Sequence, residues 1–166
     1  ALASLSFWEI DTMIMTRHGR PIAMLKSLDY DSHVKTRICQ YKAYINNRKA
    51  FYIAKQITTA KIKGQNAILK KHGLNIKKSI LEKLEQIPID RKSSYRKRLI
   101  SIEGKNAGHY FNQIFKLFPE KLRPEKRKTW KAYDGLNNVF NLAYELLKWK
   151  VHIALIKARL EPYLGF

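Results

Sequence analysis

Residues 101–111 read SIEGKNAGHYF and place one acid, Glu103, inside the most basic part of the chain. Gly104, Ala107 and Gly108 are small, so a backbone, a metal ion or a phosphate could approach Glu103 closely. A carboxylate among cations, with room beside it, suits a divalent ion that serves a phosphodiester reaction. The alternative is an acid in the first turn of a helix, which the helix dipole stabilises by about 0.3–1 kcal/mol.

The composition indicates an ordered protein with a polyanionic partner. The 166 residues suffice for one core, or for one domain plus part of another, and 45% hydrophobic content with only 7 Gly and 5 Pro favours an ordered, largely helical protein. The net charge is +20, from 33 Lys and Arg against 13 Asp and Glu. Residues 1–34 hold three basic and four acidic side chains, so the excess lies after them. Nucleic acid is the first candidate partner and an anionic membrane surface the second.

Several classes of protein do not fit the sequence. It has no GxSxG, GxxxxGK[ST], GxGxxG or HExxH motif, and its histidines lack zinc-site spacing. The single cysteine, Cys39, forms no intrachain disulfide, and we expect a packed thiol on an apolar helix face. No apolar run approaches the roughly 20 residues needed to cross a bilayer. We therefore expect a soluble, cytoplasmic protein without a membrane partner.

The first part of the chain predicts a β-hairpin. Residues 1–8 could be a short helix or the start of a strand. Residues 10–16 alternate in polarity, 17–20 supply a turn, and 21–25 form a second strand. A lone hairpin is marginal in water, so we expect further strands before Ala1.

The rest of the chain predicts helices, so the fold class is mainly α (α+β). We interpret residues 1–29 as the end of a small β-rich domain and 30–166 as a multi-helix domain, incomplete at its C-terminal end. Apolar spacing predicts helices at about 32–45, 48–71, 75–87, 91–99, from Glu103 to Pro119, and 134–159. The first would be capped by Asp31 or Ser32 and has apolar residues at Tyr30, Val34, Ile38, Tyr41 and Ile45, and the second would end at Gly73. We expect two apolar faces to be buried, one on 48–71 (Ala50, Ile53, Ala54, Ile57, Ala60, Gly64, Ala67 and Ile68) and one along the whole of 134–159.

Two basic stretches, 91–98 and 120–131, are candidate DNA- or RNA-binding segments. Residues 91–131 hold thirteen Lys and Arg against three acids, although such a run can also be plain solvated surface. Trp130 and Tyr133 could stack on a base or pack in a core. The candidate contacts are Lys105, Arg91, Arg96, Arg98, Arg123, Arg127, Lys128 and Lys131.

Three segments together resemble one known family. The first is Ile102-Glu103-Gly104 with Ala107 and Tyr110-Phe111; the second is Asp134-Gly135-Leu136-Asn137 with Tyr144-Glu145-Leu146-Leu147; the third is Leu160-Glu161-Pro162-Tyr163-Leu164-Gly165-Phe166. Gln40-Tyr41, residues 61–65 (KIKGQ) and the hairpin 19–23 fit the same pattern. In this order they resemble the CRISPR-associated adaptation integrase, also described as a metal-dependent DNA endonuclease. The resemblance covers essentially the whole chain.

The resemblance implies a homodimer that acts in antiviral defence with a small ferredoxin-like partner protein. Its substrates would be double-stranded DNA, namely the CRISPR repeat and the incoming spacer. It also implies a divalent ion, Mg or Mn, held by a Glu, a His and a second acid, and Glu103 falls on that Glu. The other two ligands are expected beyond Phe166, so the chain as given is expected to be a fragment, truncated at both ends and inactive.

The implied chemistry is phosphoryl transfer, in which a 3′-hydroxyl or water attacks a DNA phosphate. Lys105 and the two basic stretches would hold phosphates without reading sequence. Asn137 would help to shape the site, and Asp134 is better interpreted as a helix N-cap than as a ligand. Two alternatives stay open: a non-catalytic basic helical DNA- or RNA-binding module, and a basic protein that docks on an acidic partner or lipid.

Overall fold

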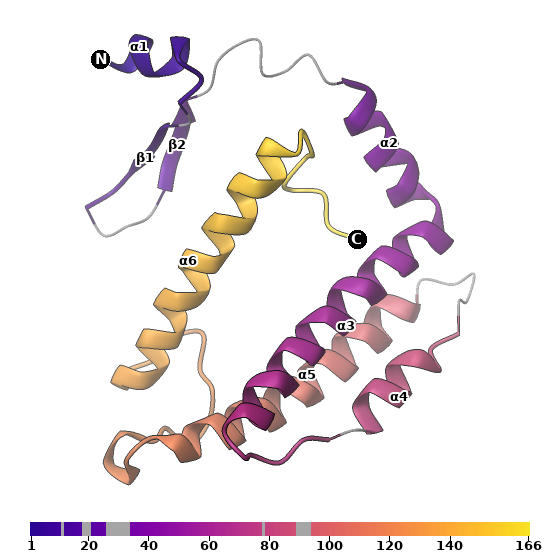
Figure 1. Ribbon diagram of the computed structural model, residues 1–166, viewed down its shortest axis with the longest axis vertical. Helices are drawn as coiled ribbons and strands as arrows, with labels where there is room; N and C mark the ends of the chain where they lie inside the picture. The colour runs from indigo at the N-terminus through magenta and orange to yellow at the C-terminus, as the bar shows by residue number, and fades with distance from the viewer. Residues whose placement is uncertain (11, 18–20, 26–33, 78, 89–93) are drawn as a thin grey trace.

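The computed structural model describes residues 1–10, 12–17, 21–25, 34–77, 79–88 and 94–166. Within them a hairpin precedes a set of helices, which confirms the predicted class of a mainly helical chain with a small β part (Figure 1). The elements in chain order are α1 (Leu2–Phe7), β1 (Thr12–Met15), β2 (Pro21–Leu25), α2 (Val34–Ile45), α3 (Asn47–Lys71), α4 (Ser79–Glu85), α5 (Ser94–Ile114), the 3-10 helices η2 (Phe115–Leu117) and η3 (Glu120–Leu122), and α6 (Gly135–Lys157).

The hairpin is antiparallel, as the alternating sequence predicts. Thr12 lies opposite Leu25 and Ile14 opposite Ala23, with a register irregularity between Ile14 and Met15. The choice left open for residues 1–8 is settled as a helix, α1. The hairpin turn at 18–20, the boundary proposed at 29/30 and the helix caps proposed at Asp31 or Ser32 lie outside the described residues. The division into two domains therefore stays a prediction.

The long helix α3 begins and ends where its sequence predicts. The Asn46 side chain accepts hydrogen bonds from the backbone N–H groups of Arg48 and Lys49, which satisfies two of the free donors at the helix start. At the other end Gly73 has φ +65°, the left-handed conformation that glycine adopts without strain. The predicted helix at 75–87 is confirmed as the shorter α4.

The buried residues of α3 agree with the predicted face only in part. Phe51, Ile62 and Leu69 are buried, whereas Ile57 and Ile68, which the predicted face contained, are exposed. Phe51 packs with Leu84, Ile87, Tyr95 and Leu99, a cluster shared by α3, α4 and α5. The start of the predicted face is therefore buried, since Ala50 is fully buried and Ala54 packs against this cluster, whereas its later part, with Gly64 and Ile68, is exposed.

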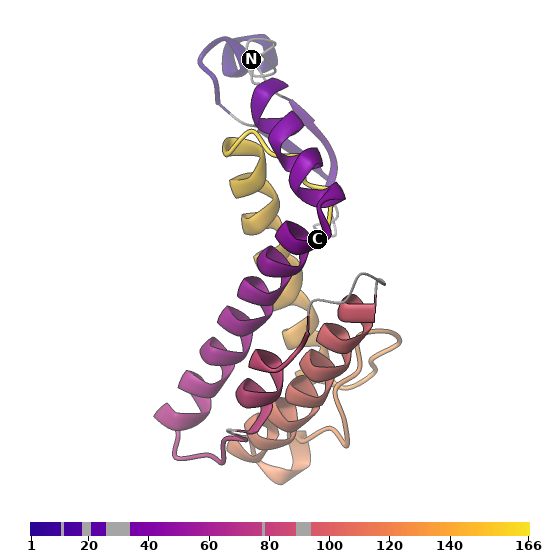
Figure 2. The same ribbon diagram turned by 90° about the vertical axis from the view of Figure 1, so that its right-hand side faces the viewer.

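Helix α5 lies alongside α3 and is one continuous helix (Figures 1 and 2). The sequence predicted a separate basic helix at 91–99, of which 91–93 lie outside the described residues. Glu103 is therefore in the middle of α5, and its interpretation as a first-turn acid is wrong. The reason is that residues 94–103 contain no Gly or Pro to end the helix, and Gly104 and Gly108 keep its ordinary backbone conformation.

A second, aromatic cluster joins the end of α5 to the start of α6. Phe140 lies 5.4 Å from Phe111 and 6.0 Å from Phe115, measured between ring centroids. Leu69, Tyr110, Ile114 and Leu136 complete this buried cluster. Such rings contribute large apolar areas, so the cluster fixes the start of α6 on α5.

Beyond its first turns, α6 is largely exposed, which corrects the expectation of a buried stripe along its length. Leu147 and Val151 are about half exposed, and only Leu136, Asn137 and Ile156 are buried in this helix. The physical reason is that α6 runs apart from α3 over its later turns (Figure 1). No described helix is both long enough and apolar enough to be a candidate membrane span.

The apolar spacing of α2 also does not correspond to burial. Val34, Ile38 and Ile45 are exposed, and Cys39 is an exposed free cysteine, which corrects the expectation of a packed thiol. The buried residue is Gln40. Its Nε2 donates to the carbonyl oxygen of Glu161 at 3.0 Å, and its Oε1 accepts from the backbone N–H of Glu161 at 2.8 Å. These two bonds hold the C-terminal segment against α2 at Gln40.

Candidate functional site

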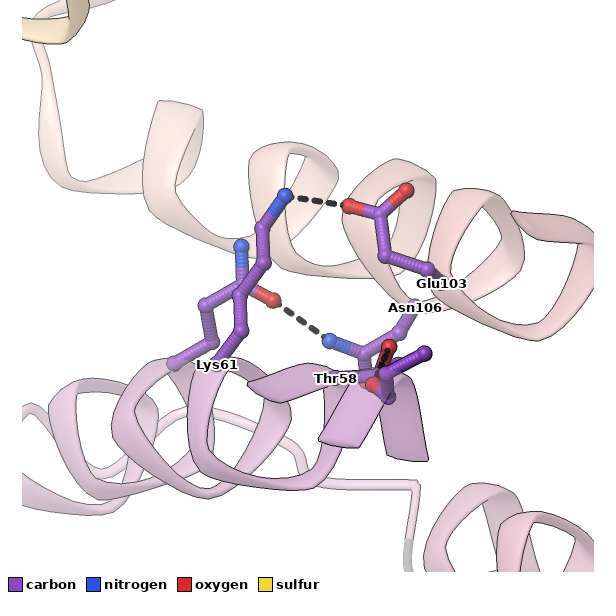
Figure 3. A network of polar contacts seen from close by, with 6 residues as sticks. Thr58, Lys61, Glu103 and Asn106 are labelled. Atoms are coloured by element: carbon purple, nitrogen blue, oxygen red, sulfur yellow. Dashed lines mark hydrogen bonds and ion pairs between the residues drawn. The ribbon is translucent and has the colours of Figure 1, made fainter. Parts of the chain in front are cut away.

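Glu103 lies at the interface of α3 and α5, where it forms an ion pair with Lys61 (Figure 3). Lys61 Nζ donates to Glu103 Oε1 at 2.5 Å, and the two side chains are 43% and 29% exposed. The pair is thus accessible from outside, so an incoming cation or anion could exchange with either partner. At this exposure the ion pair itself contributes little to stability, on the order of 0–1 kcal/mol.

One turn along each helix, a buried amide pair supports the ion pair. Asn106 Nδ2 donates to Gln65 Oε1 at 2.6 Å, and the residues are 2% and 8% exposed (Figure 3). Buried amides need partners, since an unsatisfied one costs about 1–3 kcal/mol. The Gln65–Asn106 bond therefore fixes the register of α3 against α5, and with it the position of Glu103.

Glu103 borders a cavity of about 580 Å³ between α5, α6 and the loop that joins them. The small residues Ala107 and Gly108 line it, as the sequence suggested, whereas Gly104 does not. The remaining lining residues are Lys61, Phe111, Arg127, Thr129, Asn141, Tyr144 and Glu145. The cavity thus combines carboxylates, cations and aromatic surface.

A second cavity of about 240 Å³ lies on the other side of Glu103. Its lining includes Arg96, Thr58 and Phe166. The Arg96 guanidinium lies 5.2 Å from the ring centroid of Tyr44, and hydrogen bonds with Tyr44 and Tyr95 raise the pKa of Arg96 above its usual value. Arg96 therefore keeps its positive charge next to the face that carries Glu103.

The basic loop before α6 is held by Asn137, which is fully buried. Its Oδ1 accepts from the Lys128 backbone N–H at 3.0 Å and from Arg127 Nη1 at 3.2 Å. Its Nδ2 donates to the Lys126 carbonyl oxygen at 3.0 Å and to Asp134 Oδ2 at 2.9 Å. All the polar atoms of the amide have partners, so the loop has a defined position on α6.

Asp134 is the N-cap of α6, as its sequence position predicts. Its Oδ1 accepts the backbone N–H of Asn137 at 2.8 Å. The hydrogen bonds from Asn137 hold the pKa of the Asp134 carboxyl below its usual value. Asp134 thus serves the helix and the loop, and it lines neither cavity beside Glu103.

The candidate DNA contacts divide into two groups. Arg96 and Arg127 line the cavities that Glu103 shares. Arg98 lines a different cavity, against α4. Lys105 is exposed and lies about 200° around α5 from Glu103, so it cannot reach the same site.

The other basic candidates lie in or near the loop. Arg123 donates to the carbonyl oxygens of Phe118 and Lys116 at 2.6 and 3.1 Å, which closes the turn after α5. Lys128 and Lys131 are exposed, and Arg91 lies outside the described residues. Trp130 and Tyr133 are 79% and 89% exposed, so the core alternative for them is wrong and stacking stays possible.

The described residues do not assemble a metal centre by themselves. Among them, no three His, Cys, Asp or Glu side chains come together as candidate ligands. His109 Nε2 lies 2.8 Å from the carbonyl oxygen of Asn75, on another side of α5, and Glu145 pairs with Lys148 at 3.5 Å. Glu103 fits the donor chemistry of a hard divalent ion, because it is an accessible carboxylate bordering a cavity.

Sequence reasoning did not assign a role to Lys61, Gln65, Asn106, Asn141 or Glu145. Lys61 and Gln65 are four residues apart, a spacing that puts them on one helix face. That spacing could have marked the two residues as neighbours on one face of the helix. It could not identify the partners, which lie 42 and 41 residues further along the chain.

Comparisons with known proteins agree on one family. The family model for "CRISPR associated protein Cas1" matches residues 1–166. The chain is 31% identical over 155 residues to CRISPR-associated endonuclease Cas1 1 of Archaeoglobus fulgidus, covering 80% of this chain and 45% of that protein. It is 28% identical to CRISPR-associated endonuclease Cas1 3 of Thermus thermophilus, covering 78% of this chain and 38% of that protein.

A solved structure gives the same fold. A CAS1 protein from Thermotoga maritima superposes with a TM-score of 0.80 at 23% sequence identity, over 99% of this chain and 52% of that one. At this identity the likeness bears on the fold alone. The chain spans about half the length, or less, of the relatives named here.

Proposed function

Because the chain belongs to the Cas1 family of CRISPR-associated proteins, we propose that it is part of a metal-dependent DNA endonuclease and integrase of CRISPR spacer acquisition. The relatives named as CRISPR-associated endonucleases support the nuclease part of this proposal. The observation that supports the proposal at a single residue is the position of Glu103. This carboxylate lies in the middle of α5 and borders a cavity together with Lys61 and Arg127.

In this proposal Glu103 supplies one ligand of a Mg or Mn ion. Such an ion, when bound, would neutralise the charge that develops on a phosphate under attack. The described residues offer no complete ligand set, so two further ligands must come from elsewhere. Phe166 lines the smaller cavity together with Glu103, so any residue joined to Phe166 would begin close to this carboxylate. We expect the 166 residues alone to be inactive.

The chain's own residues would position DNA around Glu103. Lys61, Arg96 and Arg127 border the two cavities that meet at this carboxylate. Cations so placed can bind phosphate oxygens without reading sequence. The net charge of +20 supports double-stranded DNA as the substrate, here the CRISPR repeat and the incoming spacer. A homodimer that works with a small ferredoxin-like protein completes the proposal.

The test is metal-dependent nicking or strand transfer by the full-length gene product. Glu103→Ala should lower the rate on the order of 100-fold or more, because a ligand to the ion is lost. Glu103→Gln should be similarly impaired, since an amide is a weaker ligand than a carboxylate. The matched control is Glu82→Ala, which removes an exposed acid from α4 and should keep the rate. Full activity of Glu103→Ala would refute the proposal at its central residue.

A second candidate is a non-catalytic basic DNA- or RNA-binding module. It is supported by the absence of a three-ligand group among the described residues. This alternative predicts binding that weakens with salt and is indifferent to chelators. Adding EDTA to the full-length protein separates the two candidates, because only the enzyme should lose a DNA product.

A further inference from the structure

From the geometry of the loop before α6 we infer that Arg127 is the phosphate-binding residue of the Glu103 cavity, and that Asn137 positions it. The inference rests on the proposed function and names one phosphate contact within it. A general basic surface would bind DNA through many interchangeable cations, whereas here one guanidinium binds the phosphate beside Glu103. The other exposed cations of the loop would contact DNA elsewhere.

The first support is the aromatic surface on which Arg127 lies. Its guanidinium carbon is 5.3 Å from the ring centroid of Phe111, 5.9 Å from that of Phe140 and 5.7 Å from that of Tyr144. Rings at this distance attract a cation and restrict the plane of a guanidinium. Arg127 is therefore held in one place, unlike a lysine on the open surface.

The second support is the hydrogen bonding of Arg127. Nη1 donates to the carbonyl oxygen of Lys128 and to Asn137 Oδ1, the buried amide that also holds the loop backbone. A guanidinium has five N–H donors. Within the described part of the chain, Nε and Nη2 of Arg127 donate no hydrogen bond, so three donors stay available for a ligand.

The third support is the charge balance of the cavity. Its two carboxylates are already paired, Glu103 with Lys61 and Glu145 with Lys148. Among the described residues, no carboxylate lies within ion-pair distance of Arg127. A partly buried guanidinium on aromatic faces, without a counterion, favours an anion, and its planar fork matches two phosphate oxygens.

The experiment compares Arg127→Gln with Lys116→Gln in the full-length protein. Lys116 is an exposed cation of η2 that lines neither cavity beside Glu103, so the two changes remove the same charge. With a labelled duplex, Arg127→Gln should weaken binding about tenfold and reduce the salt slope by about 1. Lys116→Gln should stay within about twofold of the wild type.

The rate at saturating duplex gives the second measurement. Arg127→Gln should react at least tenfold more slowly, and Arg127→Lys should also be slower, because an ammonium does not reproduce the planar fork. Tyr144→Leu removes one ring beneath the guanidinium and tests the positioning without a change of charge. It should lower the rate with the duplex still bound.

Asn137→Ala should reproduce the slow rate of Arg127→Gln although Arg127 is present, provided that circular dichroism shows a folded protein. If it does not fold, the Tyr144→Leu result decides the positioning role alone. An Arg127→Gln protein that binds and reacts like Lys116→Gln overturns the inference and leaves the proposed function intact. A wild type that binds duplex through Arg127 but never reacts overturns the proposed function and leaves the anion site.

Discussion

At the scale of single residues, Lys61 and Gln65 differ in what they contribute although they lie one turn apart on α3. The Lys61–Glu103 pair is accessible to solvent, whereas the Gln65–Asn106 pair is buried. Exposed ion pairs contribute about 0–1 kcal/mol, and a buried amide left without a partner costs about 1–3 kcal/mol. We therefore expect the Gln65–Asn106 pair to matter for the stability of the fold, and the Lys61–Glu103 pair to matter mainly for ligand binding.

We expect Gln65→Ala to lower the free energy of unfolding by about 1–3 kcal/mol, because it leaves Asn106 Nδ2 without its acceptor. Lys61→Ala should lower it by less than about 1 kcal/mol. Urea unfolding monitored by circular dichroism measures both. Equal losses in the two variants would show that burial does not distinguish these pairs.

Asp134 gives a residue-scale prediction on pH. Its pKa is lowered in the folded protein, so its contribution is present above its ordinary pKa and is lost as pH falls through the folded value. Asp134→Ala should cost about 1 kcal/mol of unfolding free energy at pH 7 through loss of the helix cap. The difference from the wild type should shrink near pH 3. A deficit that is constant between pH 7 and pH 3 would contradict this account.

At the scale of elements, the sequence predicted the helix and strand positions well and their contacts poorly. Cap residues such as Asn46, Gly73 and Asp134 act over three or four residues, so their effects can be predicted locally. The buried face of α3 could be predicted only in part, because Ile57 and Phe51 are both apolar although only Phe51 is buried. Which one becomes buried depends on where α4 and α5 pack.

For the candidate site, too, single residues could be proposed from the sequence, but the contacts between them could not. The family pattern made Glu103 and Asn137 candidates, and the loop charge made Arg127 one. The ion pair with Lys61 and the aromatic rings beneath Arg127 join segments remote in sequence, so no local pattern could show them. Lys105 illustrates the limit, since it adjoins Glu103 in sequence but lies on another side of α5, and its proposed DNA contact stays a prediction.

The two glycines of α5 allow a matched prediction on this element. A Cβ at either Gly104 or Gly108 would meet no atom within 4 Å, and each glycine costs a helix interior roughly 0.5–1 kcal/mol relative to alanine. Both Gly→Ala changes should therefore stabilise the fold by about that amount, measured by urea unfolding. Only Gly108 lines the cavity with Glu103.

We expect Gly108→Ala to slow the DNA reaction severalfold, because the added methyl group occupies space where DNA would approach. Gly104→Ala should react like the wild type, and it is the control for the helix change itself. If both variants keep full activity, no ligand comes close to α5 at Gly108. If both are equally slow, the effect arises from the helix and not from the cavity.

At the scale of the whole molecule, apolar surface is distributed unevenly. The aromatic cluster and the α3–α4–α5 cluster are buried, while Val34 and Ile38 of α2 and Leu147 and Val151 of α6 are exposed. Periodicity in sequence shows which residues share a face of a helix. It does not show whether another element covers that face, which is why a buried stripe along α6 and a packed thiol at Cys39 of α2 were wrongly expected.

The bonds between Gln40 and Glu161 also bear on the order in which the molecule assembles. They join residues 121 apart in the chain, and closing so long a loop costs on the order of 4 kcal/mol of chain entropy. The hairpin and the α3–α5 contacts close shorter loops and should form earlier. A ribosome also releases residue 40 long before residue 161. The cavity wall that Phe166 adds beside Glu103 is therefore formed after the α3–α5 contacts, so a nascent chain has this carboxylate in place before that wall is present.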